Sequence, residues 1–306
     1  MDFNELAHRL STIVAIHITP FDEQLRVDLD ALARNLDFLA DASMQVVTTC
    51  GNTGEFNSLT LDECKRITAV ACQRLVPRNI AVVAGVGYDA QTAVQMARHA
   101  ADSGAVAVMV HHPPHPFVTG LGYVQYVRTI AEAAESIGVI PYVRSANVAE
   151  DSLLELVRGV PNIVAVKYAV NDLQRFGSLV AQSPRDKSVA WICGTAEGWA
   201  PMFWSVGAVG FTSGLVNVAP RLSVEMLAAL REGKQSKVQS LWNLLKPFED
   251  LRARNNSEFN VTVVKEAMAQ LKLSSRTVRP PISELPEPMR PTIGRLLDKW
   301  KEKGYL

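Results

Sequence analysis

The chain has 306 residues, of which 48% are hydrophobic and 20% are charged, and its 31 lysines and arginines balance 31 aspartates and glutamates. A chain without net charge lacks the basic surface by which proteins bind nucleic acids and anionic membranes. The composition is typical of a soluble globular protein, and the length suits one large α/β domain or two smaller ones.

The N-terminus and the cysteines indicate a cellular compartment. Residues 1–10 carry Asp2, Glu5 and Arg9 and lack the apolar core of a signal peptide. No apolar run reaches the ~20 residues that a membrane-spanning helix needs. The four cysteines form no C-x-x-C pair, and a chain of this length does not depend on disulfide bonds. We therefore expect a cytoplasmic protein with reduced thiols and no membrane or nucleic-acid partner.

Short apolar runs rich in β-branched residues alternate with longer amphipathic stretches over most of the chain. Most of these runs are continuous rather than alternating, which is typical of parallel strands buried on both faces. The predicted strands cover residues 13–19, 45–50, 80–86, 105–111, 138–143, 163–168, 188–194 and 207–214.

Helical patterns fill the intervals between these runs. Leu29, Leu32, Leu36 and Leu39 lie on one face of the first helix, and Thr60 with Glu63 forms a capping box at the start of the next. The first helix covers residues 29–40, the second begins after Thr60, and the others cover residues 90–103, 122–137, 151–158, 172–183, 197–206 and 220–232.

Eight strand–helix steps at intervals of about 30 residues predict a (β/α)₈ TIM barrel over residues 1–233. A doubly wound open sheet is the alternative, but no G-x-G-x-x-G follows the first strand. After Gly233 the pattern predicts helices at 236–253, 258–271 and 288–303 with no strands between them. Residues 234–306 are therefore interpreted as a C-terminal helical extension packed on the barrel.

The active site of such a barrel lies at the carboxyl ends of its strands. Lys167 ends the apolar run of the sixth strand, where burial would lower its pKa and favour the neutral amine that attacks a ketone. A lysine that reaches solvent or pairs with a carboxylate is the structural alternative. Tyr142 ends the fifth strand, about 4.8 Å away if the two strands are neighbours. It can relay protons to an imine, or it can be a core tyrosine.

Two loops add further candidate residues. G-N-T-G-E at 51–55 exposes backbone N–H groups that suit a carboxylate, and it lacks the lysine of a nucleotide-binding P-loop. A plain strand–helix turn capped by Glu55 is the alternative. His111, His112 and His115 suggest a metal, but prolines restrict their geometry and no carboxylate is near in sequence. We favour a loop wall or a subunit contact there, and predict no metal and no cofactor.

Three segments, GNTGEFNSLTLDE at 51–63, PNIVAVK at 161–167 and GAVGFTSGLVNVAP at 207–220, resemble motifs of one enzyme family. That family is the dihydrodipicolinate synthase / N-acetylneuraminate lyase family of Schiff-base lyases. I-T-P-F at 18–21 and V-R-P-P at 278–281 extend the resemblance to nearly the whole chain.

The resemblance implies roles for individual residues. Lys167 would form an imine with a 2-keto acid, Tyr142 would relay protons with Thr53, and the backbone at Asn52 and Thr53 would hold the carboxylate. It also implies a homotetramer, a dimer of dimers. The candidate substrate-binding residues are Gly51, Asn52, Arg144, Gly194, Phe211, Ser213 and His115.

Departures from the family pattern bear on the substrate. Synthases have Y-N-V-P where this chain has Tyr142-Val-Arg144-Ser, and threonine at the position of Asn52. The tyrosine that they take from a neighbouring subunit falls near His115. The chain is more similar to the branch that dehydrates keto-deoxy sugar acids, such as 5-dehydro-4-deoxyglucarate dehydratase, and we predict this reaction. The alternatives are dihydrodipicolinate synthase, a pyruvate-dependent aldolase, or a non-catalytic barrel that binds a keto acid.

Overall fold

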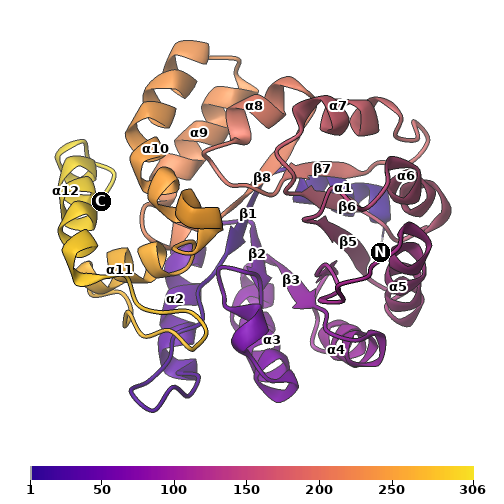
Figure 1. The fold of residues 1–306 in the computed structure, drawn as a ribbon, viewed down its shortest axis with the longest axis horizontal. Helices are drawn as coiled ribbons and strands as arrows, with labels where there is room; N and C mark the ends of the chain where they lie inside the picture. The colour runs from indigo at the N-terminus through magenta and orange to yellow at the C-terminus, as the bar shows by residue number, and fades with distance from the viewer. Residues whose placement is uncertain (1) are drawn as a thin grey trace.

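Eight parallel strands pair in chain order, and β1 also pairs with β8, which closes them into a barrel (Figure 1). The computed structural model describes residues 2–306. The strands are β1 Ile13–Ile16, β2 Val46–Thr49, β3 Ala81–Val86, β4 Ala107–Val110, β5 Gly138–Val143, β6 Ala165–Tyr168, β7 Ala190–Cys193 and β8 Gly210–Ser213. The predicted barrel is confirmed, the open sheet is wrong, and most strands are shorter than their apolar runs.

Helices follow the strands and surround the barrel (Figure 1). They are α2 Leu29–Asp41, α3 Leu61–Leu75, α4 Ala90–Asp102, α5 Gly120–Ala133, α6 Glu150–Gly159, α7 Leu173–Ala181, α8 Ala200–Ser205 and α9 Pro220–Arg231. The predicted capping box is confirmed, because Thr60 Oγ1 accepts from the Glu63 amide while the Glu63 carboxylate accepts from the Thr60 amide. Four 3₁₀ helices are η1 Phe56–Ser58, η2 Val76–Arg78, η3 Leu215–Asn217 and η4 Glu287–Met289.

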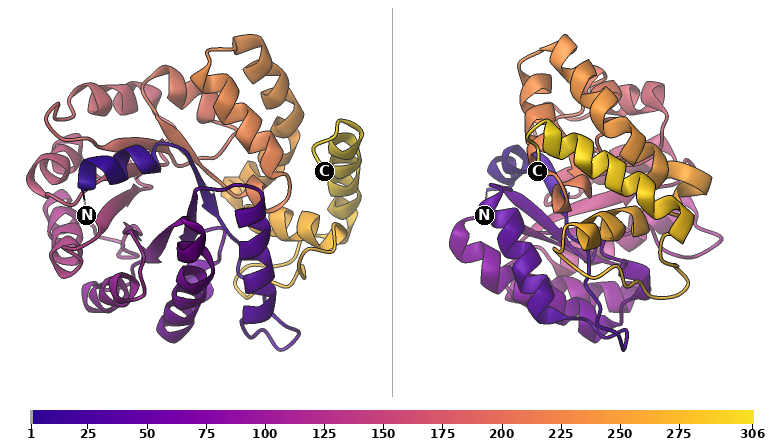
Figure 2. Two further views of the ribbon diagram at one scale, coloured as in Figure 1. Left: turned by 180° about the vertical axis from the view of Figure 1, so that it is seen from behind. Right: turned by 90° about the vertical axis from the view of Figure 1, so that its left-hand side faces the viewer.

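The amino end of the barrel is covered by α1, Phe3–Leu10, which the sequence patterns did not predict. Its buried residues Leu6, Ala7 and Leu10 belong to the same apolar cluster as the inward-facing strand residues. Figure 2 shows this helix lying across the barrel. Because apolar side chains close this end, only the carboxyl ends of the strands are left to form a site.

The C-terminal extension consists of α10 Gln235–Ser257, α11 Thr262–Gln270 and α12 Arg290–Glu302 (Figures 1 and 2). Gly233, with a φ of +65°, lies between α9 and α10, at the predicted boundary. The backbone leaves helical geometry at Arg254, so the regular part of α10 ends where the sequence predicts. Across residues 2–306, no helix combines the length and the apolar character that crossing a bilayer demands.

Candidate active site

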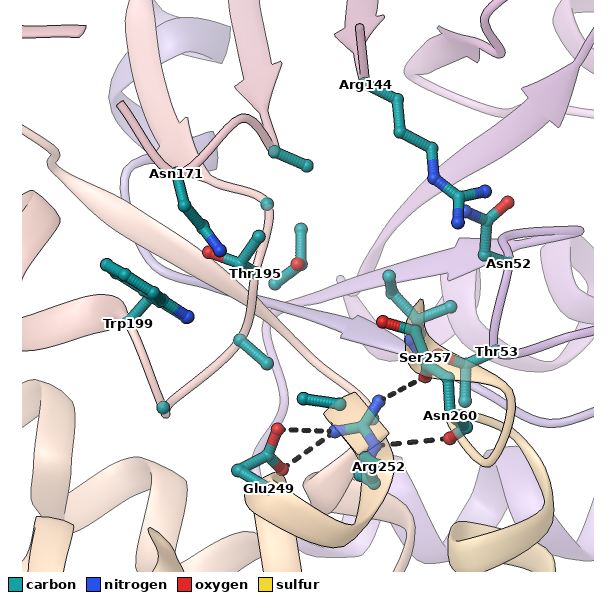
Figure 3. Close-up of a pocket in the computed structure, with 18 of the residues that line it drawn as sticks. Asn52, Thr53, Arg144, Asn171, Thr195, Trp199, Glu249, Arg252, Ser257 and Asn260 are labelled. Atoms are coloured by element: carbon teal, nitrogen blue, oxygen red, sulfur yellow. Dashed lines mark hydrogen bonds and ion pairs between the residues drawn. The ribbon is translucent and has the colours of Figure 1, made fainter. Parts of the chain in front are cut away.

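A cavity of about 450 Å³ lies at the carboxyl ends of the strands, between the barrel and α10 (Figure 3). One side of it is formed by the barrel and the other by the C-terminal extension. The barrel residues that line it include Ile16, Asn52, Thr53, Tyr142, Arg144, Lys167, Gly194, Thr195, Thr212 and Gly214. The structure therefore brings Lys167, Tyr142, Thr53, Asn52, Arg144 and Gly194 to one place, as the sequence predicts.

Lys167 is buried inside the barrel, with only 3% of its surface exposed. Its Nζ lies 4.0 Å from the centroid of the Tyr142 ring and 3.6 Å from Sδ of Met109. No carboxylate within residues 2–306 forms an ion pair with it, so the structural alternatives for this lysine do not fit. Burial, with a smaller contribution from the positive charge of Arg144, lowers the pKa of Lys167 from 10.5 to about 7. The amine is thus available as a nucleophile near neutral pH.

Tyr142 is the residue paired with Lys167 between β5 and β6. Its hydroxyl accepts a hydrogen bond from Nδ2 of Asn52 at 3.1 Å, and burial raises its pKa. The phenol therefore stays protonated at neutral pH and has a lone pair and a proton to offer. This geometry suits a group that gives a proton to an oxygen leaving Lys167 and takes one back.

Arg144 follows β5 on the rim of the cavity, and Figure 3 shows its side chain directed toward Asn52. Within the described residues no carboxylate lies close enough to form an ion pair with its guanidinium. The positive charge of Arg144 is, after burial, the second cause of the lowered pKa of Lys167. A cation beside the Asn52–Thr53 backbone suits a carboxylate on the substrate.

The loop after β2 is tied to the extension. Glu55 and Lys265 of α11 form an ion pair at 2.5 Å, with both side chains fully buried. Glu55 also accepts from the Arg279 amide at 3.1 Å. Glu55 thus acts structurally, as the alternative interpretation held. Gly51 does not line the cavity: a Cβ there would lie 2.6 Å from Cγ2 of Ile16, so this glycine lets the loop pack on β1.

Two residues of β8 that were predicted to bind substrate, Phe211 and Ser213, do not line the cavity. Side chains alternate between the faces of a strand, and here Thr212 faces the cavity. Phe211 and Ser213 face the surrounding helices instead, where Phe211 is part of the outer apolar core. The Ser213 hydroxyl accepts from the Val216 amide and lies 3.3 Å from Oγ of Ser223. Both side chains thus point away from the cavity.

His115 also lies outside the cavity of its own chain. It is exposed in the loop between β4 and α5, where the Phe117 amide donates to its Nδ1. His111 turns inward, with its Nε2 2.8 Å from the Cys50 carbonyl oxygen, and burial lowers its pKa to about 3. In the part of the chain that the structure describes, no three His, Cys, Asp or Glu side chains are grouped to hold a metal.

The sequence patterns missed the contribution of the extension. Glu249, Arg252 and Asn260 line the cavity opposite Asn171, Thr195 and Trp199 (Figure 3). A signal was present in the spacing: Leu241, Leu245, Phe248 and Arg252 repeat every three or four residues, so Arg252 falls on the buried face of α10. A charged residue in such a stripe marks a site candidate.

Comparisons with known proteins agree with this geometry. A model of the dihydrodipicolinate synthetase family matches residues 9–300. The crystal structure of dihydrodipicolinate synthase from Oceanobacillus iheyensis has a TM-score of 0.94 at 42% identity, covering 98% of this chain and 100% of that one. A probable 5-dehydro-4-deoxyglucarate dehydratase from Rhodococcus jostii is 30% identical over 92% of this chain and 93% of its own. A 4-hydroxy-tetrahydrodipicolinate synthase from Methanothrix thermoacetophila is 30% identical over 93% of this chain and 95% of its own. The chain therefore belongs to the dihydrodipicolinate synthetase family of lyases, as its motifs predict.

Proposed function

We propose that this protein dehydrates a keto-deoxy sugar acid through an imine between Lys167 and the substrate ketone. The observation that carries the proposal is the environment of Lys167, a buried amine with a pKa of about 7 packed against a tyrosine at the base of a polar cavity. A cavity of about 450 Å³ also has room for a chain longer than pyruvate.

In the proposed reaction, the neutral Lys167 amine attacks C2 of the keto acid and forms a carbinolamine. Tyr142 donates a proton to the departing hydroxyl group, water leaves, and an iminium remains. The Asn52–Thr53 backbone and Arg144 hold the carboxylate next to it. Thr53 partners Tyr142 in the proton relay.

The iminium then withdraws electrons from C3, which acidifies the C3–H bond. A base removes that proton, and the C3–C4 double bond forms as hydroxide leaves C4, so that one water is lost in this step. Hydrolysis of the conjugated imine releases the product and restores the amine. Because the iminium is the electron sink, the proposed reaction uses no cofactor.

A second candidate is the condensation or cleavage of a carbon–carbon bond with pyruvate, by a synthase or an aldolase. The 42% identity to a structure titled dihydrodipicolinate synthase favours it. Tyr142-Val-Arg144 and Asn52, which differ from the synthase pattern, favour dehydration. The two reactions share one iminium, so the products distinguish them: a new conjugated keto acid for dehydration, and pyruvate with an aldehyde for cleavage.

The test is reductive trapping with borohydride, first with pyruvate and then with a panel of 2-keto-3-deoxy acids, read by peptide mass spectrometry. We expect the adduct on Lys167, and loss of trapping in Lys167→Met. Lys187→Met is the matched control, because burial lowers the pKa of Lys187 to about 8 although it lies outside the cavity. No adduct on Lys167 with any ligand, in folded protein, would overturn the enzyme proposal and favour a keto-acid-binding barrel.

We further propose a cytoplasmic homotetramer, a dimer of dimers. Four free, buried cysteines support a reducing compartment. Phe117 of the His115 loop and Leu121 of α5 support an interface there, because 82% and 67% of their surfaces are exposed in the single chain. Light scattering measures the assembly, and Phe117→Ser is expected to weaken it.

A further inference from the structure

The C-terminal extension supplies a rigid polar wall to the cavity, made of Glu249, Arg252 and Asn260 (Figure 3). Nη1 of Arg252 donates to both carboxylate oxygens of Glu249, at 2.8 and 3.1 Å. Nε donates to the Asn260 carbonyl oxygen at 3.2 Å, and Nη2 donates to Oδ1 of Asn260 at 2.8 Å. Only 6% of the Arg252 side chain is exposed, so these contacts hold the guanidinium in one position.

Arg252 packs against Gly214, which follows β8, because this glycine has no side chain to occupy the space. A Cβ at Gly214 would lie 2.7 Å from Nη2 of Arg252 and 3.2 Å from Oγ1 of Thr53. The guanidinium of the extension and the hydroxyl of the catalytic loop thus approach the same point. An Nη2 group has two N–H donors, and Asn260 accepts one of them, which leaves one for a ligand between Arg252 and Thr53.

The backbone that carries Asn260 is strained. Asn255, Asn256 and Ser257 have φ values of 47°, 59° and 67°, three consecutive left-handed residues that are not glycine. Such conformations cost energy and persist where the surrounding structure holds them, often at binding sites. Here they interrupt the helix and bring Asn256, Ser257 and Asn260 to the edge of the cavity.

The two arginines of the cavity differ in charge balance. Arg144 has no carboxylate partner within residues 2–306, so it attracts an anion. Arg252 and Glu249 neutralise one another and offer a fixed donor beside a fixed acceptor. A hydroxyl group needs both at once, because its oxygen accepts while its proton is donated.

We infer that the Glu249–Arg252–Asn260 wall is a specificity-determining subsite that binds the hydroxyl groups of a polyhydroxylated 2-keto acid. The inference rests on the proposed function, since it takes the keto end of the ligand to lie at Lys167. The proposed subsite distinguishes sugar acids from aliphatic keto acids of the same length. The extension thus selects the distal part of the substrate, while the barrel performs the chemistry on its keto end.

The experiment compares 2-keto-3-deoxygluconate with 2-oxohexanoate, two six-carbon 2-keto acids of which only the first carries hydroxyl groups. Half-saturation is measured by borohydride trapping on Lys167 and, without the need for a trapped adduct, by protection against thermal unfolding. Wild-type protein is expected to prefer the hydroxylated acid about 10- to 100-fold, the range of one or two hydrogen bonds to charged groups. Arg252→Lys should reduce this preference to less than about threefold.

Controls separate a specificity role from a structural one. Arg128→Lys alters a surface ion pair with Glu155 and should keep the preference. The deciding quantity is the ratio of half-saturation between the two six-carbon acids, because a general effect of Arg252→Lys on folding or on imine formation weakens both alike. If Arg252→Lys does not fold, the double variant Glu249→Gln with Arg252→Gln takes its place, since it leaves no buried charge unpaired.

Each outcome decides the inference. Equal half-saturation of the two acids in wild-type protein would overturn it, and so would a preference that survives in the variants. An equal loss for both six-carbon acids would show a structural role and would also overturn it. If the preference follows Arg252 in thermal protection while no adduct forms on Lys167, the subsite stands and the proposed Schiff-base function fails.

Discussion

The buried amine of Lys167 predicts that imine formation follows an apparent pKa near 7 rather than near 10. In the barrel the pKa of this lysine falls from 10.5 to about 7, mainly because burial removes water from the ammonium form. That difference corresponds to roughly 5 kcal/mol between the two protonation states. At pH 7 about half of the molecules would carry the neutral amine, against about one in 3,000 for a lysine in water.

The perturbation is Arg144→Gln, which removes the second cause of the lowered pKa. Arg144 is exposed at the rim, where solvent and salt weaken its field. We therefore expect the apparent pKa of Lys167 to rise by less than about one unit. Raising the salt concentration should move the wild-type value in the same direction and leave the variant unchanged.

The assay is the rate of pyruvate trapping on Lys167 by cyanoborohydride from pH 5.5 to 9.5, with pyruvate at saturation so that weaker binding in the variant does not contribute. The rate should rise with pH as the ammonium loses its proton, and level off above about pH 8. A wild-type rate that still rises tenfold per pH unit between 8 and 9.5 would refute the argument, because it would show a hydrated lysine. An unchanged midpoint in Arg144→Gln would refute the assigned role of the rim arginine alone.

Three further substitutions test the proton relay of Tyr142, the buried Glu55–Lys265 ion pair and the helix cap at Thr60. Tyr142→Phe should lower turnover about 10²- to 10⁴-fold while unfolding stays near wild type, since within residues 2–306 the hydroxyl hydrogen-bonds to Asn52 alone. Unchanged turnover would exclude the relay. Lys265→Met leaves Glu55 buried without its partner and should cost about 3–5 kcal/mol in urea unfolding, whereas a loss below about 1 kcal/mol would contradict the buried pair. Thr60→Ala removes the N-cap of α3 and should lower the free energy of unfolding by about 1 kcal/mol while activity stays full. A loss of activity would show that this helix end contributes to the active site.

The barrel could be predicted because its strands are buried on both faces and therefore appear as continuous apolar runs. Helix α1 escaped prediction for the opposite reason. It spans eight residues, too few for a periodic pattern to stand out, and its stability comes from burying Leu6, Ala7 and Leu10 against the barrel. Local signals were present nonetheless, because the Asp2 side chain caps the helix, Glu5 lies in its first turn and His8 and Arg9 lie in its last.

Because both faces of each strand are buried, the sequence pattern does not show which strand residues face the inside of the barrel. Lys167 and Tyr142 could be selected because a polar group at the end of an apolar run has few structural uses. In β8 the residues Phe211, Thr212 and Ser213 are all buried, so no alternation of polarity marks the inward side. Thr212 faces inward through its pairing with β1 at Val14, a register that is set only when the barrel closes.

The extension raises a different difficulty, and it is the part to which we assign substrate choice. The helical spacing places Arg252 on the buried face of α10, but only the docking of α10 beside α9 decides that this face meets the cavity. Lys167 and Tyr142 support every reaction that starts from an iminium, so they do not separate a dehydratase from a synthase. That separation depends on contacts to the rest of the substrate, for which we propose Arg144 and the Glu249–Arg252–Asn260 wall, because both line the cavity. A change of substrate within this fold therefore requires a change in the rim and the extension, while the lysine and its tyrosine stay the same.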